Sequence, residues 1–167
     1  QRTKARSLVN NSSGRKIRAI RMDANFHQIL FLCTGNYYRS RFAELLFNHS
    51  ARQSELCWKA ESRGLRLNPQ NPGAISKHVV SYLQRHGIQH PSEHRYPLGV
   101  TAKDLEQSQR IVAVKRVEHL PLLEQLFPTW VDRVEYWNIH DLDCAGPEEA
   151  LAQLKQQVLT LVEQLNR

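Results

Sequence analysis

The sequence predicts an α/β fold, with a four-stranded parallel sheet between two layers of helices. Short β-rich segments alternate with segments of helical periodicity along most of the chain. Residues 111–114 are apolar at every position, as in parallel strands that are covered on both faces. Because parallel neighbours need long return connections, this alternation implies helical crossovers on both faces of the sheet. With 167 residues, the chain is long enough for one domain with a substantial core.

The first predicted strand and helix flank a loop that contains a glycine. Residues 28–32 form an apolar run, and residues 40–52 carry Phe42, Leu45 and Leu46 on one side of a predicted helix. Between them lie Cys33, Thr34, Gly35, Asn36, Tyr37, Tyr38 and Arg39. Since the first turn of a helix directs free amide groups outward, the loop lies where an anion would bind.

The middle of the chain predicts two further strands. Residues 56–62 alternate as a strand, and a turn-rich connection leads to a helix that is capped by Ser76 and ends at Gly87. Thr101 is suited to cap a short helix before the strand at residues 111–114.

The last third of the chain completes the alternation. A helix is predicted at residues 120–127, a fourth strand at 134–139 and a strongly amphipathic helix at 148–166. In parallel sheets of this kind, ligands bind beyond the carboxyl ends of the strands. The loops after the first and fourth strands lie at this edge, so we expect Cys33 and Asp141 to be close in space.

The net charge of +7 is concentrated at one end of the sequence. Residues 1–21 hold seven Lys or Arg and no acid, whereas the rest of the chain has 16 basic and 16 acidic residues. We expect residues 1–25 to be a basic, disordered tail and residues 26–167 to be a single domain. Because no aromatic residue accompanies the charge, a solvated tail is favoured over a targeting segment or an arm that contacts phosphate backbones. No specific nucleic-acid partner is expected.

The three cysteines, Cys33, Cys57 and Cys144, are odd in number and far apart. This spacing fits neither a disulfide framework nor a zinc site with paired ligands. We therefore expect a reducing, cytoplasmic location. No apolar run approaches the roughly 20 residues of a membrane helix, so a soluble protein without a membrane partner is predicted. We also expect a monomer or weak dimer.

The loop contains the groups needed for nucleophilic attack on a phosphate. A thiol attacks as its thiolate, and a free thiol, with a pKa of about 8.5, is mostly protonated at neutral pH. The positive end of the following helix, the charge of Arg39 and the hydroxyl of Ser40 would each stabilise a thiolate at Cys33. Gly35 and Asn36 tolerate left-handed backbone angles, which let successive amides converge on an anion. A phosphate would fit between these amides and the guanidinium of Arg39.

The pattern Cys-x5-Arg-Ser after a strand, formed here by Cys33, Arg39 and Ser40, resembles the active-site loop of the low-molecular-weight protein tyrosine phosphatases. Ser62 and Gly64 also look like a second-strand motif of that family. The resemblance implies a flavodoxin-like or Rossmann-like fold of the phosphotyrosine phosphatase I type. It also implies hydrolysis of phosphomonoesters through a phosphocysteine, with a phosphorylated protein or a small aryl phosphate as the substrate. The family needs no metal and no other cofactor.

The resemblance further implies a role for each matching residue. Cys33 would attack phosphorus, Ser40 would stabilise the leaving thiolate, and Asp141 would protonate the leaving oxygen and then activate water. The implied phosphate-binding set is Thr34, Gly35, Asn36, Tyr37, Tyr38, Arg39 and Ser40. Asp141 is followed by Leu142 where the family has proline, so Asp143 is the alternative acid.

Departures from the family pattern leave the substrate open. No tyrosine follows the candidate acid, and Tyr38 stands where many relatives have a second cysteine. Two related enzymes are less favoured: an arsenate reductase would need a relay of further cysteines, and an arginine phosphatase has a small hydroxyl residue where this chain has Tyr37. A catalytically weak phosphate-binding regulatory module is the alternative from another class. Cys144 could approach Cys33, but an unpaired thiol is favoured.

Overall fold

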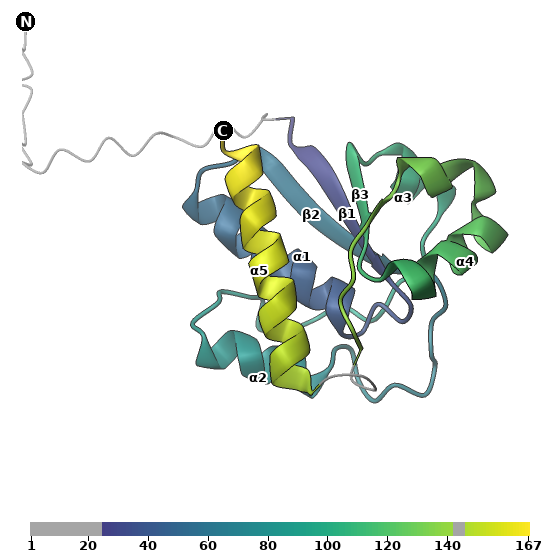
Figure 1. Cartoon of the computed structure of the whole chain (residues 1–167). Helices are drawn as coiled ribbons and strands as arrows, with labels where there is room; N and C mark the ends of the chain where they lie inside the picture. Colours follow the sequence, from purple (N-terminus) through teal and green to yellow (C-terminus); the bar gives the residue numbers. More distant parts are fainter. Residues whose placement is uncertain (1–24, 142–145) are drawn as a thin grey trace, which may run out of the picture.

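The computed structural model describes residues 25–141 and 146–167. Four strands form one parallel sheet in the order β2-β1-β3-β4, and the first three of these strands are labelled in Figure 1. The strands are β1 (His27–Cys33), β2 (Trp58–Gly64), β3 (Arg110–Ala113) and β4 (Glu135–Tyr136). Almost all of the predicted tail falls on residues 1–24, outside the described residues. Asp143, the alternative acid, and Cys144, the expected unpaired thiol, also lie outside them, so these three predictions stay predictions.

Helices cover both faces of the sheet (Figure 1). One layer contains α1 (Arg39–Gln53), α2 (Lys77–Arg85) and α5 (Pro147–Leu165). The other layer contains α3 (Ala102–Glu106), α4 (Arg116–Leu126) and the 3-10 helix η1 (Pro128–Arg133). This arrangement confirms the predicted three-layer α/β fold with a four-stranded parallel sheet. Among the described residues, no helix combines the length and the apolar character that a bilayer crossing requires.

The central strand β1 contributes to both cores because successive side chains of a strand point to opposite faces. Ile29, Phe31 and Cys33 belong to the core beneath α1 and α5, and Leu30 and Leu32 belong to the core on the α4 side. All five are buried, which explains the uninterrupted apolar run in the sequence. Cys33 is the last residue of β1 and therefore lies at the carboxyl edge of the sheet.

The predicted helix boundaries around α2 and α3 are confirmed by their caps. The Ser76 hydroxyl accepts a hydrogen bond from the His78 amide, and Gly87, beyond the end of α2, has a φ of 62°. Thr101 and Asp104 form a reciprocal capping box at the start of α3.

Three elements differ from the predictions. β2 runs from Trp58 to Gly64, two residues later at both ends than the predicted 56–62. α4 begins at Arg116, earlier than the predicted start at residue 120, because its first turn contacts the Cys33 loop and lacks apolar periodicity. β4 has only two residues, Glu135–Tyr136, instead of the predicted run to residue 139. Beyond it the chain still follows β3 through single backbone hydrogen bonds, including one of 2.8 Å from the Ile139 amide to the Val114 carbonyl.

Candidate active site

The loop after β1 surrounds the sulfur of Cys33 with hydrogen-bond donors. Asn36 has a φ of 51°, in the left-handed region, and its amide nitrogen lies 3.3 Å from the Cys33 Sγ. Ser40, in the first turn of α1, places its Oγ 2.9 Å from the same sulfur. Because Ser40 Oγ accepts a hydrogen bond of 2.9 Å from Asn36 Nδ2, its own proton is directed toward the sulfur.

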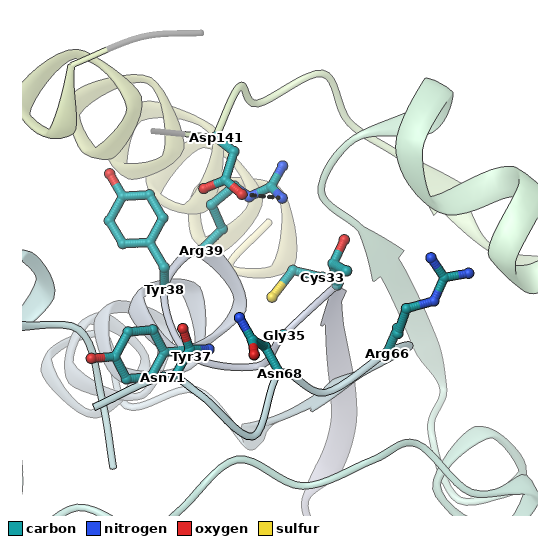
Figure 2. Close-up of a pocket in the computed structure, with 10 residues that line it drawn as sticks. Cys33, Gly35, Tyr37, Tyr38, Arg39, Arg66, Asn68, Asn71 and Asp141 are labelled. Carbon is teal, nitrogen blue, oxygen red and sulfur yellow. Dashed lines mark hydrogen bonds and ion pairs between the residues drawn. The ribbon is translucent and has the colours of Figure 1, made fainter. Parts of the chain in front are cut away.

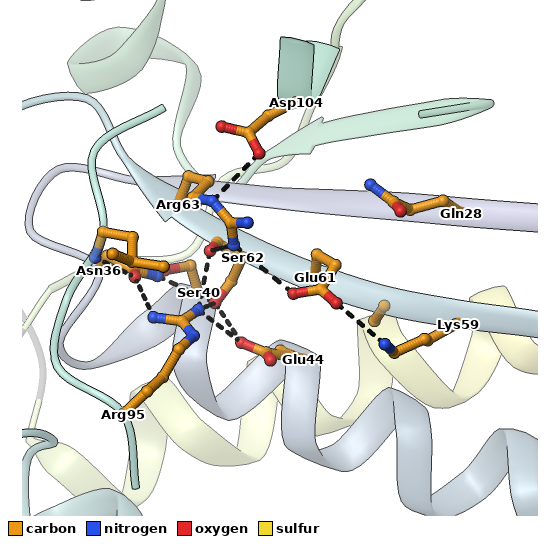
Figure 3. Close-up of polar contacts among 12 residues, drawn as sticks. Gln28, Asn36, Ser40, Glu44, Lys59, Glu61, Ser62, Arg63, Arg95 and Asp104 are labelled. Carbon is orange, nitrogen blue, oxygen red and sulfur yellow. Dashed lines mark hydrogen bonds and ion pairs between the residues drawn. The ribbon is translucent and has the colours of Figure 1, made fainter. Parts of the chain in front are cut away.

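Asn36 is fully buried and ties the loop to the neighbouring segments (Figure 3). Its Nδ2 also donates to Ser62 Oγ on β2 (2.9 Å), and its Oδ1 accepts from Arg95 Nη1 (2.9 Å) and from the Leu98 amide (3.0 Å). Arg95 in turn donates to the Ser62 carbonyl (2.9 Å) and forms an ion pair of 3.2 Å with Glu44. The loop therefore depends on Arg95, which the sequence analysis did not identify.

Gly64, at the end of β2, allows the loop to approach the sheet closely. A Cβ atom at this position would lie 2.9 Å from the Thr34 carbonyl oxygen and 3.1 Å from the Asn36 Cβ. The closest atom, Leu67 Cδ2 at 2.6 Å, belongs to an exposed side chain that can move away. The other two belong to the loop backbone and to the buried Asn36, so the loop could not keep its path beside a larger residue.

We expect Gly64→Ala to lower the free energy of unfolding by about 1–3 kcal/mol, since the new methyl group must displace the loop. Turnover of a phosphomonoester should fall with it. Gly99→Ala is the matched control, because a Cβ there meets no atom within 4 Å. Urea unfolding and steady-state kinetics of both variants measure the two effects. Wild-type values for Gly64→Ala would contradict the close approach.

Arg39 opens α1 and is only 2% exposed. Its Nη1 donates to Glu118 Oε2 (3.1 Å) and to the Ile139 carbonyl (3.0 Å). Its Nη2 donates to Glu118 Oε1 (2.7 Å) and to Asp141 Oδ2 (3.2 Å). The contact with Asp141 places the predicted acid beside the loop after β1, as expected from the topology of the sheet.

A cavity of about 370 Å³ opens above Cys33 (Figure 2). Its lining consists of Cys33, Thr34, Gly35, Tyr37, Tyr38, Arg39, Arg66, Asn68, Asn71 and Asp141. Two residues of the predicted phosphate-binding set, Asn36 and Ser40, do not line it: both are fully buried and support the loop from behind. Arg66, Asn68 and Asn71 were not predicted. They come from the turn-rich segment after β2, which lies at the same carboxyl edge of the sheet.

Tyr37 and Tyr38 form one side of the cavity (Figure 2). The Tyr37 hydroxyl donates to the Pro72 carbonyl at 2.6 Å, and the Tyr38 hydroxyl donates to the Pro147 carbonyl at 3.3 Å. Burial, together with the negative charge of Asp141, raises the pKa of Tyr38 to about 12. Tyr38 is therefore a neutral, packed wall of the site at physiological pH.

The segment that carries Asp141 is attached to the end of β3. Lys115 lies two residues after the end of β3 and is largely buried, and its Nζ lies 3.0 Å from His140 Nδ1. The contact fixes the residue next to Asp141.

The site is that of a cysteine-dependent phosphatase. Its cysteine lies at the carboxyl edge of a parallel sheet, the loop directs amide and hydroxyl groups to the sulfur, and a buried arginine lies beside them. A sequence profile described as low molecular weight phosphotyrosine protein phosphatase matches residues 28–167. The chain belongs to this family, whose members are hydrolases of phosphate esters. No individual curated protein matches the sequence.

Three solved structures share the fold of this chain. A low molecular weight protein tyrosine phosphatase from T. tengcongensis has 23% identity and a TM-score of 0.70, over 83% of this chain and 99% of its own. A variant of the arginine phosphatase YwlE with a phosphorylated active site serine has 21% identity and a TM-score of 0.71, over 84% and 96%. Wzb from Vibrio vulnificus, in complex with benzylphosphonate, has 15% identity and a TM-score of 0.65, over 84% and 97%.

Proposed function

We propose that this chain hydrolyses aryl phosphomonoesters, among them phosphotyrosine in proteins, through a phosphocysteine at Cys33. The observation that carries the proposal is the environment of the Cys33 sulfur. Ser40 Oγ lies 2.9 Å and the Asn36 amide nitrogen 3.3 Å from Sγ, and Arg39 adds a positive charge nearby. Hydrogen bonds and positive charge stabilise a thiolate, which is the attacking form of cysteine.

In the first step, the Cys33 sulfur forms a bond to phosphorus and the bond from phosphorus to the leaving oxygen breaks. Arg39 and the loop amides hold the equatorial oxygens of the transferring group. Asp141, which also lines the cavity, gives its proton to the leaving oxygen. The products of this step are the free alcohol or phenol and the phosphocysteine.

In the second step, water attacks phosphorus and the bond from sulfur to phosphorus breaks. Asp141, now a carboxylate, takes a proton from the water, and the electron pair of the broken bond returns to the Cys33 sulfur. The Ser40 hydroxyl stabilises the departing thiolate. Inorganic phosphate leaves, and the site returns to its starting state.

The walls of the cavity favour an aryl substrate. Tyr37 and Tyr38 both line the cavity, and aromatic rings attract one another beyond the effect of simple burial. Tyr37, held by its hydrogen bond to Pro72, also places a bulky ring where the related arginine phosphatases carry a small hydroxyl residue, which disfavours phosphoarginine.

The test is turnover of para-nitrophenyl phosphate in EDTA, with and without orthovanadate. We expect metal-independent hydrolysis that orthovanadate inhibits, and faster release of phosphate from phosphotyrosine peptides than from phosphoserine or phosphoarginine peptides. Turnover that requires a metal would contradict the mechanism, and equal rates on the three peptides would contradict the selectivity. The cytoplasmic location, the monomer or weak dimer and the absence of specific nucleic-acid or membrane partners stay predictions.

A further inference from the structure

Glu118, in the first turn of α4, holds the tip of the Arg39 side chain. Its two carboxylate oxygens accept from the two terminal nitrogens, at 2.7 and 3.1 Å. A guanidinium can bind an anion with this tip or with the side edge formed by Nε and one terminal nitrogen. Glu118 takes the tip, and no hydrogen bond within residues 25–141 and 146–167 uses Nε. The side edge is therefore the part of Arg39 that is available to a phosphate.

A short series of hydrogen bonds fixes Glu118 in turn. The Lys115 amide donates to His119 Nδ1 (3.0 Å), so Nδ1 is the acceptor and the ring proton is on Nε2. Nε2 lies 3.1 Å from Thr34 Oγ1 and donates to it. The hydroxyl proton of Thr34 is then directed to Glu118 Oε1, which lies 2.8 Å away.

The charges of these groups agree with this arrangement. His119 is fully buried, and burial lowers its pKa, so the ring is neutral at physiological pH. Partial burial opposes ionisation of Glu118, but its contacts with His119, Arg39 and Thr34 outweigh this effect and hold the pKa of its carboxyl well below the usual range. The carboxylate that holds Arg39 is therefore charged.

We propose that Glu118 is a positioning residue that fixes the side edge of Arg39 for the transferring phosphate. The inference rests on the proposed function. Glu118 is not part of the cavity lining and acts through two residues that are: Arg39, and Thr34, which follows Cys33. It thus connects the beginning and the end of the phosphate-binding loop from a helix on the other face of the sheet.

Glu118→Gln tests the proposal, because it keeps the shape of the side chain and removes its charge and one acceptor. We expect kcat for para-nitrophenyl phosphate to fall about 10- to 100-fold, since small displacements of a positioning group have effects of this size. The inhibition constant of orthovanadate should rise several-fold. Glu124→Gln, at an exposed position of the same helix, is the matched control and should retain wild-type kinetics.

A double-mutant cycle with Arg39→Lys separates positioning from a general structural effect. Lysine lacks the two terminal nitrogens that Glu118 holds in Arg39. Glu118→Gln should therefore change kcat little in the Arg39→Lys background. Fully additive losses would overturn the proposal. Wild-type kcat and orthovanadate inhibition in Glu118→Gln would also overturn it, as would an increased kcat, which would show that Glu118 restrains Arg39 instead.

Thr34→Val supplies a second test that does not depend on the folding of Glu118→Gln. It removes the hydroxyl between His119 and Glu118, and we expect a smaller loss of kcat, about 3- to 10-fold. Unchanged kinetics in Thr34→Val would overturn the role of this series of hydrogen bonds. A different result would contradict the proposed function itself: turnover that survives in both the Cys33→Ser and the Arg39→Lys variants.

Discussion

Cys33→Ser is expected to lower turnover of para-nitrophenyl phosphate by about four orders of magnitude or more, as for other enzymes that lose their nucleophile. The serine hydroxyl would occupy nearly the same place, but it is almost never ionised near neutral pH, and the donors from Ser40 and Asn36 cannot compensate for this. Steady-state kinetics with purified protein measure the loss.

Cys57→Ser is the matched control for this prediction. Cys57 is exposed, whereas Cys33 is buried at the base of the cavity. Removal of the exposed thiol should leave kcat and KM unchanged. Substantial turnover in Cys33→Ser, or equal losses in the two variants, would show that the sulfur of Cys33 is not the nucleophile.

Asp141→Asn is expected to lower kcat by about 100- to 10,000-fold on substrates with poor leaving groups. Phenyl phosphate should show a larger loss than para-nitrophenyl phosphate, because para-nitrophenolate leaves without much help from an acid. Orthovanadate should bind no more weakly, since the change removes a negative charge 3.2 Å from Arg39 Nη2. The effect is measured by steady-state kinetics on a series of aryl phosphates whose leaving phenols differ in acidity.

Asp143→Asn completes this experiment, because Asp143 is the alternative acid in the sequence. We expect it to keep most of the activity and the wild-type dependence on the leaving group. A variant at residue 143 that is inactive on phenyl phosphate, beside an active Asp141→Asn, would reverse the assignment.

The phosphate-binding loop could be predicted from the sequence because its chemistry is local. Cys33, Asn36, Arg39 and Ser40 lie within one short segment, and a strand before it and a helix after it fix their geometry. The position of Asp141 followed from topology, since the carboxyl ends of parallel strands share one edge of the sheet. The contact of 3.2 Å between Arg39 and Asp141 confirms this part of the prediction.

The groups that hold the loop could not be predicted in the same way. Arg95 and Glu118 reach it from distant segments, and neither follows an apolar pattern that marks its surroundings. One signal was present: Glu118 and His119 come shortly after β3, at the same edge as Cys33. A helix turn at that edge can contact the site instead of the hydrophobic core, so it need not show apolar periodicity. Polar residues there are therefore candidates for the site even without a helical pattern.

Detection of the phosphocysteine tests the central claim most directly. The protein is mixed with para-nitrophenyl phosphate, denatured rapidly during turnover and digested for mass spectrometry. The account predicts one added phosphoryl group on the peptide that contains Cys33, and none on that peptide in Cys33→Ser. A phosphoryl group on another residue, or active turnover without any phosphorylated protein, would contradict it.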